Sequence, residues 1–178
     1  GIPMWERDLG PGVIPGVWYA PFISFDLDGD GVDEIWFLNN LNPRLPFSLN
    51  ARVLERIDPC SGKTTGQWDW PDNTIDDTMS HSYRFYITGG YVNGQPILVT
   101  AQGTYRTMYL QGYNSDMSKR WEITIPEDGS ARASHLCPIL DFNNDGVDEL
   151  FWGERLISLD DGHEVFCGDK GRYSGHSD

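Results

Sequence analysis

Hydrophobic positions along the chain recur in short runs that are separated by polar turns, and one such arrangement appears three times. Residues 22–37 and 137–152 each place an acidic turn between two apolar stretches. Residues 85–100 repeat this plan with an ordinary Asn-Gly turn in place of the acidic one. Each copy is followed by a second hairpin-like stretch that ends on an aromatic residue. The predicted unit is therefore four strands joined by turns, and it returns about every 50 to 60 residues.

The central strands of these units are too apolar for a sheet with one solvated face. Residues 35–37 and 97–99 are apolar at consecutive positions rather than at alternate ones. This pattern predicts strands that are buried on both faces, as in stacked sheets. Four strands per repeat at this period are typical of a β-propeller. We therefore predict an all-β fold of about three four-stranded antiparallel β-propeller blades, without an amphipathic helix.

Three blades do not close a ring, because propellers use about four to eight blades. We therefore expect residues 1–178 to form a partial β-propeller domain, part of a larger propeller of seven or eight blades. The alternative is a small three-repeat sandwich. The chain begins at Gly1 without a visible signal peptide, so its start looks processed or cut. The expected repeats cover about 17–70, 80–125 and 132–169, and the next blade begins at about 175.

Composition narrows the range of partners. The formal charge is -14 and the pI is near 4.4, which argues against nucleic acid. The chain contains no apolar run long enough for a membrane span. Aromatic residues make up 13% of the chain, and exposed aromatic rings often stack on sugars. Cys60, Cys137 and Cys167 lack a CxxC spacing, so zinc is not expected, whereas one disulfide with one free thiol remains open.

The two acidic turns have the spacing of calcium loops. Carboxylate or amide oxygens recur at loop positions one, three, five and nine, and a glycine at position six allows a sharp turn. Hard oxygen ligands in this arrangement suit Ca²⁺. A solvated acidic turn is the alternative, but crowded acids repel one another without a cation. The predicted ligands, in a structural rather than catalytic role, are Asp26, Asp28, Asp30 and Glu34 in one loop and Asp141, Asn143, Asp145 and Glu149 in the other.

Strand alternation places these acidic turns at one end of the blades and the reactive residues at the opposite end. Segments that lead into the blades contain three of the four histidines, while His163 lies in a turn and is expected to be solvated. Loops between second and third strands add Tyr, Arg and Asn. The candidate catalytic residues are His81, Tyr83, Arg84, Tyr105, Arg106 and His135. The candidate substrate-binding residues are Asn39, Asn40, Arg132, Arg155 and His176.

This set of side chains favours β-elimination from a uronate sugar. His or Tyr can carry protons, and Arg or Asn can neutralise the enolate charge that develops beside the carboxylate. A glycosidase needs two placed carboxylates, and this end offers few acids beyond Glu154 and Asp178. The chain contains no Gly-x-Ser-x-Gly elbow, phosphate loop or dinucleotide fingerprint.

Several segments of the chain follow one another in a characteristic order: the two acidic loops, residues 98–106 with Tyr113 and 120–121, residues 134–153, and residues 175–178. In this order they resemble the segments of the β-propeller polysaccharide lyases, namely the family 11 rhamnogalacturonan lyases and the propeller-type ulvan lyases. The second repeat departs from the pattern because it lacks a calcium loop.

The resemblance implies a secreted or periplasmic lyase that cleaves an acidic polysaccharide of rhamnose and uronic acid by β-elimination. The complete protein is expected to be a monomer that binds no nucleic acid. The rival hypothesis is a non-catalytic calcium-binding propeller module that binds carbohydrate or protein. Convergence of His81, Arg106 and His135 in one cleft would favour the enzyme.

Overall fold

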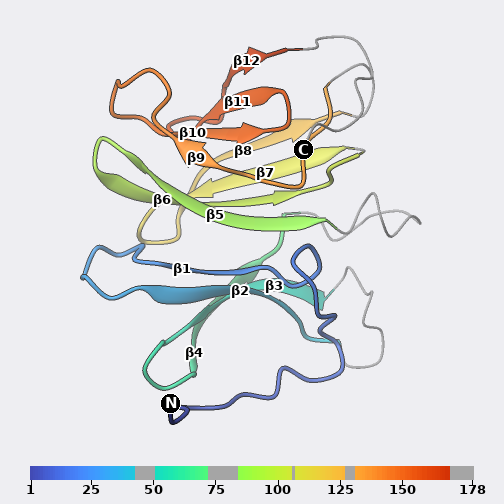
Figure 1. Cartoon of the computed structure of the whole chain (residues 1–178), viewed down its shortest axis with the longest axis vertical. Coiled ribbons are helices and arrows are strands. Elements are labelled where there is room, and N and C mark those ends of the chain that lie inside the picture. Colours follow the sequence, from blue (N-terminus) through green and yellow to red (C-terminus); the bar gives the residue numbers. More distant parts are fainter. Residues whose placement is uncertain (43–50, 72–83, 106, 127–130, 169–178) are drawn as a thin grey trace.

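The computed structural model describes residues 1–42, 51–71, 84–105, 107–126 and 131–168. Within these ranges the chain is all-β, with three four-stranded sheets and no α-helix. The sheets lie on one another as a stack (Figure 1). This confirms the predicted fold class of four-stranded antiparallel blades. No helix long and apolar enough to cross a membrane occurs among the described residues.

Each sheet is built from strands that are consecutive in the chain, paired antiparallel in the order of the sequence. Blade 1 comprises β1 (Phe22–Phe25), β2 (Glu34–Asn40), β3 (Arg52–Ile57) and β4 (Thr64–Asp69). Blade 2 comprises β5 (Phe85–Val92), β6 (Gln95–Gln102), β7 (Met108–Tyr113) and β8 (Lys119–Ile125). Blade 3 comprises β9 (Ile139–Leu140), β10 (Glu149–Trp152), β11 (Arg155–Ser158) and β12 (Glu164–Cys167). The expected start of a further blade, near residue 175, lies outside the described residues.

The three blades share their irregularities as well as their strands. In every blade the register between the third and fourth strands shifts once, and the shift marks a bulge whose extra residue lies on the fourth strand. The shifts fall between Arg56 and Ile57, between Gly112 and Tyr113, and between Leu156 and Ile157. A shared bulge shows that the blades repeat one geometry although their sequences have diverged.

Two apolar cores fill the spaces between the blades, and alternate residues of blade 2 enter different cores. Leu98 packs with Trp36 of blade 1, whereas Ile97 and Val99 pack with Trp152 of blade 3. All five of these side chains are buried. The consecutive apolar positions of the central strands therefore have the predicted cause, which is burial on both faces.

Neighbouring blades approach most closely through their first strands, β1 with β5 and β5 with β9, and β2 also lies near β5. This arrangement is expected of blades that converge on a common axis. The β1–β2, β5–β6 and β9–β10 turns all lie at one end of the stack, which we call the acidic end (Figure 1). The chain enters the first strand of each blade from the opposite end. These ends are set by strand direction alone, as the sequence predicts.

The N-terminal segment lies against the outer face of blade 1. Arg7 forms an ion pair with the fully buried Glu55 of β3 at 2.6 Å, and the Trp5 indole donates a hydrogen bond to the Pro59 carbonyl at 2.7 Å. Glu55 also accepts hydrogen bonds from Asn39 and Thr64. Burial alone would raise the pKa of Glu55, but these donors outweigh it and hold the pKa below its ordinary value. Glu55 is therefore ionised and fully partnered.

The three cysteines are all free thiols in the structure. Cys60 is exposed, while Cys137 and Cys167 are half-buried on blade 3. The disulfide that the sequence left open is therefore not formed.

Candidate functional site

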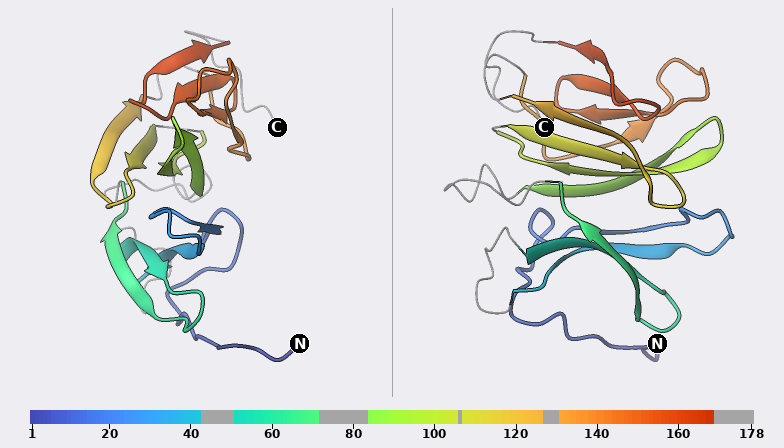
Figure 2. Two further views of the ribbon diagram at one scale, coloured as in Figure 1. Left: turned by 90° about the vertical axis from the view of Figure 1, so that its left-hand side faces the viewer. Right: turned by 180° about the vertical axis from the view of Figure 1, so that it is seen from behind.

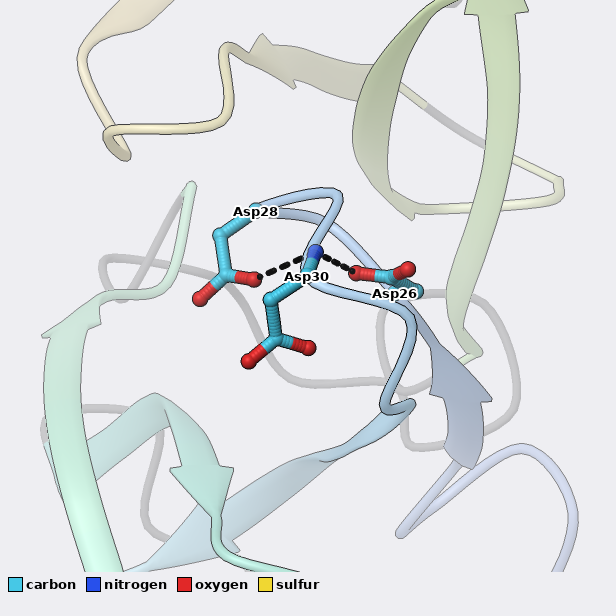
Figure 3. Close-up of side chains that lie close together, drawn as sticks. All are labelled: Asp26, Asp28 and Asp30. Atoms are coloured by element: carbon cyan, nitrogen blue, oxygen red, sulfur yellow. Dashed lines mark hydrogen bonds between the residues drawn. The ribbon is translucent and has the colours of Figure 1, made fainter.

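The acidic loop of blade 1 is held together by its own backbone. Asp26 accepts hydrogen bonds from the backbone N–H groups of Gly29, Asp30 and Gly31 at 2.8–3.1 Å. Asp28 and Asp30 each accept a hydrogen bond from the N–H group two residues further on. One carboxylate oxygen from each of the three aspartates lies within 4.8 Å of the others (Figure 3). The loop therefore gathers three anionic oxygens around one point.

Glu34 closes this loop from the start of β2. Its carboxylate accepts a hydrogen bond from the Leu27 N–H at 3.1 Å and lies 3.8 Å from the Arg56 guanidinium. Burial and the negative charge of Asp28 raise the pKa of Glu34 above its ordinary value, despite the bond from Leu27. The loop thus concentrates negative charge beyond what its own hydrogen bonds neutralise.

The acidic loop of blade 3 repeats most of this hydrogen-bond pattern at equivalent positions. Asp141 accepts from the N–H groups of Asp145 and Gly146, and Glu149 accepts from the Phe142 N–H at 2.9 Å. The Asn143 side chain accepts from Asp145 N–H at 3.0 Å, as Asp28 does from Asp30. Two loops far apart in the sequence therefore fold to closely similar hydrogen-bonded geometries.

Blade 2 carries a plain turn at this end, and the turn contacts the acidic loop of blade 3. Asn93 and Gly94 have φ angles of 51° and 78°, as the predicted two-residue Asn-Gly hairpin requires. Asn93 N–H donates to the Gly146 carbonyl at 2.7 Å, and Tyr91 N–H donates to the Asp148 carboxylate at 2.7 Å. The acidic end is thus continuous across blades 2 and 3.

At the opposite end, two of the predicted proton carriers form a hydrogen-bonded pair. The Tyr105 hydroxyl, from the loop after β6, lies 2.7 Å from His135 Nε2, in the segment that leads into β9. The two rings are perpendicular, with centroids 6.1 Å apart. Both side chains are half-buried, so the pair is shielded on one side and accessible on the other. Residues that are 30 positions apart in sequence meet here across two blades.

A cation and an indole complete this cluster. The Arg84 guanidinium carbon lies 5.1 Å from the Tyr105 ring centroid and 4.2 Å from that of Trp18. The Trp18 ring in turn lies 4.9 Å from the His135 ring. We refer to Trp18, Arg84, Tyr105 and His135 as the aromatic–cation cluster. A phenol, an imidazole and a guanidinium on one surface can move protons and hold an anion.

Buried hydrogen bonds fix the backbone beneath the cluster. The Ser134 carbonyl accepts from the Tyr86 hydroxyl and from the Trp152 indole, both at 3.1 Å, and Ala133 N–H donates to the Thr104 carbonyl at 3.2 Å. Burial raises the pKa of Tyr86 far above its ordinary value, so this phenol stays protonated as a structural donor. The segments that carry Tyr105 and His135 are therefore tied to each other and to the core.

The predicted substrate-binding residues that the structure describes are all buried. The Asn39 amide donates to Glu55 at 2.6 Å, and the Asn40 side chain accepts from the Asn42 N–H at 3.0 Å. Arg155 pairs with Glu164 and donates to the Ala131 carbonyl, while Arg132 is only 4% exposed. These bonds of Asn39, Asn40 and Arg155 run within one blade or to the segment that enters it, and the predicted binding role of these residues stays a prediction. The predicted residues His81, Tyr83, Arg106 and His176 lie outside the described residues.

A cavity of about 440 Å³ lies between β5 and the segment before β1, and two of its lining residues adjoin members of the cluster in the sequence. Its lining is neutral and includes Val17 next to Trp18, Phe85 next to Arg84, and Phe22. Val17 and Phe22 are 73% and 71% exposed, so apolar side chains face solvent at its mouth. Its volume falls in the range of small-ligand sites, which is about 300–1,000 Å³.

Sequence reasoning missed Trp18 and Asp148. Trp18 lies ahead of the first acidic hairpin, where no hydrophobic periodicity marks it. Asp148 precedes the last loop ligand and is an ordinary acidic residue in the pattern, yet its carboxylate and N–H both bind Tyr91 of blade 2. Asp33 occupies the equivalent position in the first acidic loop, so the repeat could have identified Asp148 as part of its loop. The repeat could not have predicted that Tyr91 is the partner of Asp148.

The geometry places the chain in the class of β-propeller blades that carry acidic loops at one end and a Tyr–His–Arg group at the other. Solved structures share this fold. An exo-type rhamnogalacturonan lyase, YesX, superposes with a TM-score of 0.75 at 22% identity, over 89% of this chain and 32% of that one. The rhamnogalacturonan lyase PL11 of Bacillus licheniformis gives a TM-score of 0.70 at 20% identity over the same shares.

Two curated relatives also match the sequence. The rhamnogalacturonan endolyase YesW of Bacillus subtilis is 25% identical over all of this chain and 33% of its own length. The rhamnogalacturonan exolyase YesX of the same organism is 24% identical over 90% of this chain and 31% of its own length. The chain therefore spans about a third of the relatives that it matches. No protein-family model matches it.

Proposed function

We propose that this chain is part of a polysaccharide lyase that cleaves a rhamnose- and uronate-containing polymer by β-elimination. One observation carries the proposal: the hydroxyl of Tyr105 and Nε2 of His135 share a hydrogen bond beside the Arg84 guanidinium. The names of the relatives, all rhamnogalacturonan lyases, support the same chemistry.

In the proposed reaction His135, Tyr105 and Arg84 each have one role. A base, His135 or Tyr105, removes the proton on the ring carbon next to the uronate carboxylate. The electron pair forms a carbon–carbon double bond, the neighbouring glycosidic carbon–oxygen bond breaks, and the leaving oxygen takes a proton from the other member of the pair. Arg84 holds the carboxylate and neutralises the enolate charge. Water is not consumed, so the two products together have the mass of the substrate.

Variants of the full-length protein test this proposal by the ultraviolet absorbance of the unsaturated uronate product. Tyr105→Phe and His135→Gln should each lower kcat by roughly 10²- to 10⁴-fold, the usual contribution of a positioned proton carrier. Arg84→Lys should lose less activity than Arg84→Ala, because lysine keeps the charge but not the bidentate grip. His163→Gln is the matched control: the His163 side chain is exposed and bonds Asp161 in its own turn, so activity should not change.

The outcomes separate the enzyme from its rival. Products that lack the unsaturated chromophore, or unchanged turnover in both Tyr105→Phe and His135→Gln, would replace the lyase with a non-catalytic carbohydrate-binding module. Comparison of rhamnogalacturonan with ulvan and with unbranched polygalacturonate identifies the polymer. We expect rhamnogalacturonan to be cleaved fastest, because the relatives are named for it.

We also propose that both acidic loops hold Ca²⁺. The donor set fits this ion: three carboxylates within 4.8 Å in blade 1, and the same loop fold with Asn143 in blade 3. Asp26, Asp28, Asp30 and Glu34 would hold one ion, and Asp141, Asn143, Asp145 and Glu149 the other. The bound ion would neutralise the loop charge and pin the hairpin tip. Elemental analysis should find calcium, and a chelator should lower the Tm; a calcium-free protein with an unchanged Tm would contradict the proposal.

Finally, we propose that the full-length protein is a monomer that acts outside the cytoplasm. Its proposed substrate is a polymer too large to cross a membrane, and extracellular calcium is high enough to fill weak sites. Cell fractionation and light scattering of the purified protein test the two statements. Recovery in the cytoplasmic fraction, or a dimeric mass, would contradict them.

A further inference from the structure

We propose that Trp18 is a positioning residue for the elimination: its indole holds the Arg84 guanidinium and the His135 imidazole in one fixed arrangement. The inference rests on the proposed lyase function and assigns a role to a residue that the sequence pattern did not select.

The contacts of Trp18 run to both functional groups. The guanidinium carbon of Arg84 lies 4.2 Å from the indole centroid, and the His135 ring centroid lies 4.9 Å from it at an interplanar angle of 48°. Tyr105 contacts the same two groups, through a hydrogen bond to His135 and through its ring face to Arg84. The four side chains thus form a closed circuit of contacts: the Arg84 guanidinium and the His135 imidazole each contact the rings of Trp18 and Tyr105.

This circuit removes the freedom that each group would otherwise have. The hydrogen bond between Tyr105 and His135 sets the position of Nε2 but does not by itself set the plane of the imidazole, which the Trp18 ring restricts further. Arginine has many rotamers, and an indole face attracts its guanidinium and restricts them. A cation held against a ring is also pre-set to receive a carboxylate without reorganisation.

Trp18 is itself fixed between two blades. Its carbonyl accepts a hydrogen bond from Phe85 N–H at 2.9 Å, and Phe85 directly follows Arg84. On the other side, the Pro21 carbonyl accepts from Leu38 N–H of β2 at 3.0 Å. The Gly16 carbonyl accepts from Tyr19 and Ala20, which closes a turn around Trp18. The segment therefore bridges blades 1 and 2, and the indole reaches across to His135 before blade 3.

The experiment measures kcat and KM of the full-length protein with Trp18→Phe and Trp18→Leu. Leucine removes the aromatic face, and we expect a loss in kcat/KM of roughly 100-fold, the size expected when a reacting group is misplaced by about 1 Å. Phenylalanine keeps a smaller ring and should lose only roughly 10-fold in kcat/KM, through a lower kcat and a higher KM. A merely space-filling role predicts the reverse ranking or no difference between the two.

Double variants locate the effect. In a His135→Gln background, Trp18→Phe should no longer lower kcat, and in an Arg84→Ala background it should no longer raise KM, because the group that Trp18 positions is gone. Trp68→Leu is the matched control. Trp68 is also half-buried and lies 5.8 Å from an arginine, Arg56, but it is on β4 and packs against Trp36 within blade 1. Trp68→Leu should lower the Tm without a change in kcat/KM, whereas Trp18→Leu must lose activity while folded.

Two results would overturn the inference. One is wild-type kcat/KM in a folded Trp18→Leu protein. The other, which applies even where Trp18→Leu does not fold, is a strictly additive cycle between Trp18→Phe and both His135→Gln and Arg84→Ala. A wild-type protein without lyase activity would instead refute the proposed function, so the two failures are distinguishable.

Discussion

At the scale of single residues, the two acidic loops differ at one ligand position. Asp28 and Asn143 accept the same backbone hydrogen bond, at 3.2 Å and 3.0 Å, yet only Asp28 carries a charge. Ligand charge tunes the calcium affinity of oxygen loops. The chain therefore contains two loops that share one backbone fold and differ in the charge of one side chain.

Exchanging these two side chains tests the proposed calcium sites. Asp28→Asn should weaken calcium binding in blade 1 and raise the Tm of the calcium-free protein, because one repulsive charge is removed. Asn143→Asp should do the opposite in blade 3. Isothermal titration and thermal melts with and without chelator measure both effects. Equal calcium affinities in the wild-type protein, Asp28→Asn and Asn143→Asp would show that these side chains do not bind the ion.

Residue-scale prediction from sequence succeeded where chemistry repeats and failed where it depends on pairing. The fold of the acidic loops follows from spacing alone, because a glycine and four oxygens leave few ways to fold. Pairing of Tyr105 with His135 required the relative position of two blades. The sequence offered both Arg84 and Arg155 as site residues; in the structure Arg155 pairs with Glu164, and Arg84 lies against the Trp18 ring.

At the scale of elements, β3 carries a buried carboxylate that fastens the N-terminal segment. The folded-state pKa of Glu55 is below its ordinary value of 4.5, because hydrogen bonds and Arg7 outweigh burial. A depressed pKa means that Glu55 stabilises the fold above pH 4.5 and that this contribution is lost as pH falls through the folded-state value.

We therefore predict that Glu55→Gln lowers the Tm at neutral pH and that the difference from wild type shrinks below about pH 4.5. Thermal melts across this range measure the effect. Glu6→Gln is the control, since Glu6 is exposed on the same segment. A gap between wild type and Glu55→Gln that stays constant with pH would contradict the role assigned to Glu55.

The turns at the two ends of β6 differ in how much they depend on glycine. Gly94 and Gly103 both have positive φ angles, 78° and 94°, but only Gly103 is crowded: a Cβ there would lie 2.2 Å from the Thr107 carbonyl oxygen. Gly94→Ala should cost about 1–2 kcal/mol from backbone strain. Gly103→Ala should destabilise the protein more and also displace Tyr105. Chemical denaturation compares them; equal losses would contradict this account.

Elements were predictable from the sequence to different degrees. The hairpins and their turn types follow from apolar runs and from Asn-Gly or acidic turns. The bulge that recurs in the pairing of the third and fourth strands leaves no mark in composition. The N-terminal cover of blade 1 was also unforeseen, because Trp5 and Arg7 lie in a segment without periodicity and act through partners far away in the sequence, Pro59 and Glu55.

At the scale of the whole molecule, the acidic end couples two blades. Tyr91 and Asn93 of blade 2 donate backbone hydrogen bonds to Asp148 and to Gly146 of blade 3. Blade 2 lacks an acidic loop of its own, and its β5–β6 hairpin tip lies at the same end of the stack as the β9–β10 loop of blade 3 (Figure 2).

We predict that removal of calcium increases amide hydrogen exchange at Tyr91 and Asn93 as well as in the blade 3 loop. The Gly103 N–H, which donates to the Arg84 carbonyl at the opposite end of the same blade, serves as the internal reference and should keep its protection. Exchange that rises equally at both ends would indicate global loosening instead of coupling through the acidic end.

The order of strands has a consequence for synthesis of the protein. Within each of the three described sheets a strand pairs with its neighbours in sequence, so a blade can form its sheet as soon as its last strand leaves the ribosome. Its core is different, because Trp36 and Leu54 of blade 1 pack against Phe85 and Leu98, which are translated later. Every nascent blade therefore exposes an apolar face until the next blade has been synthesised. Chaperones would be needed most during these intervals.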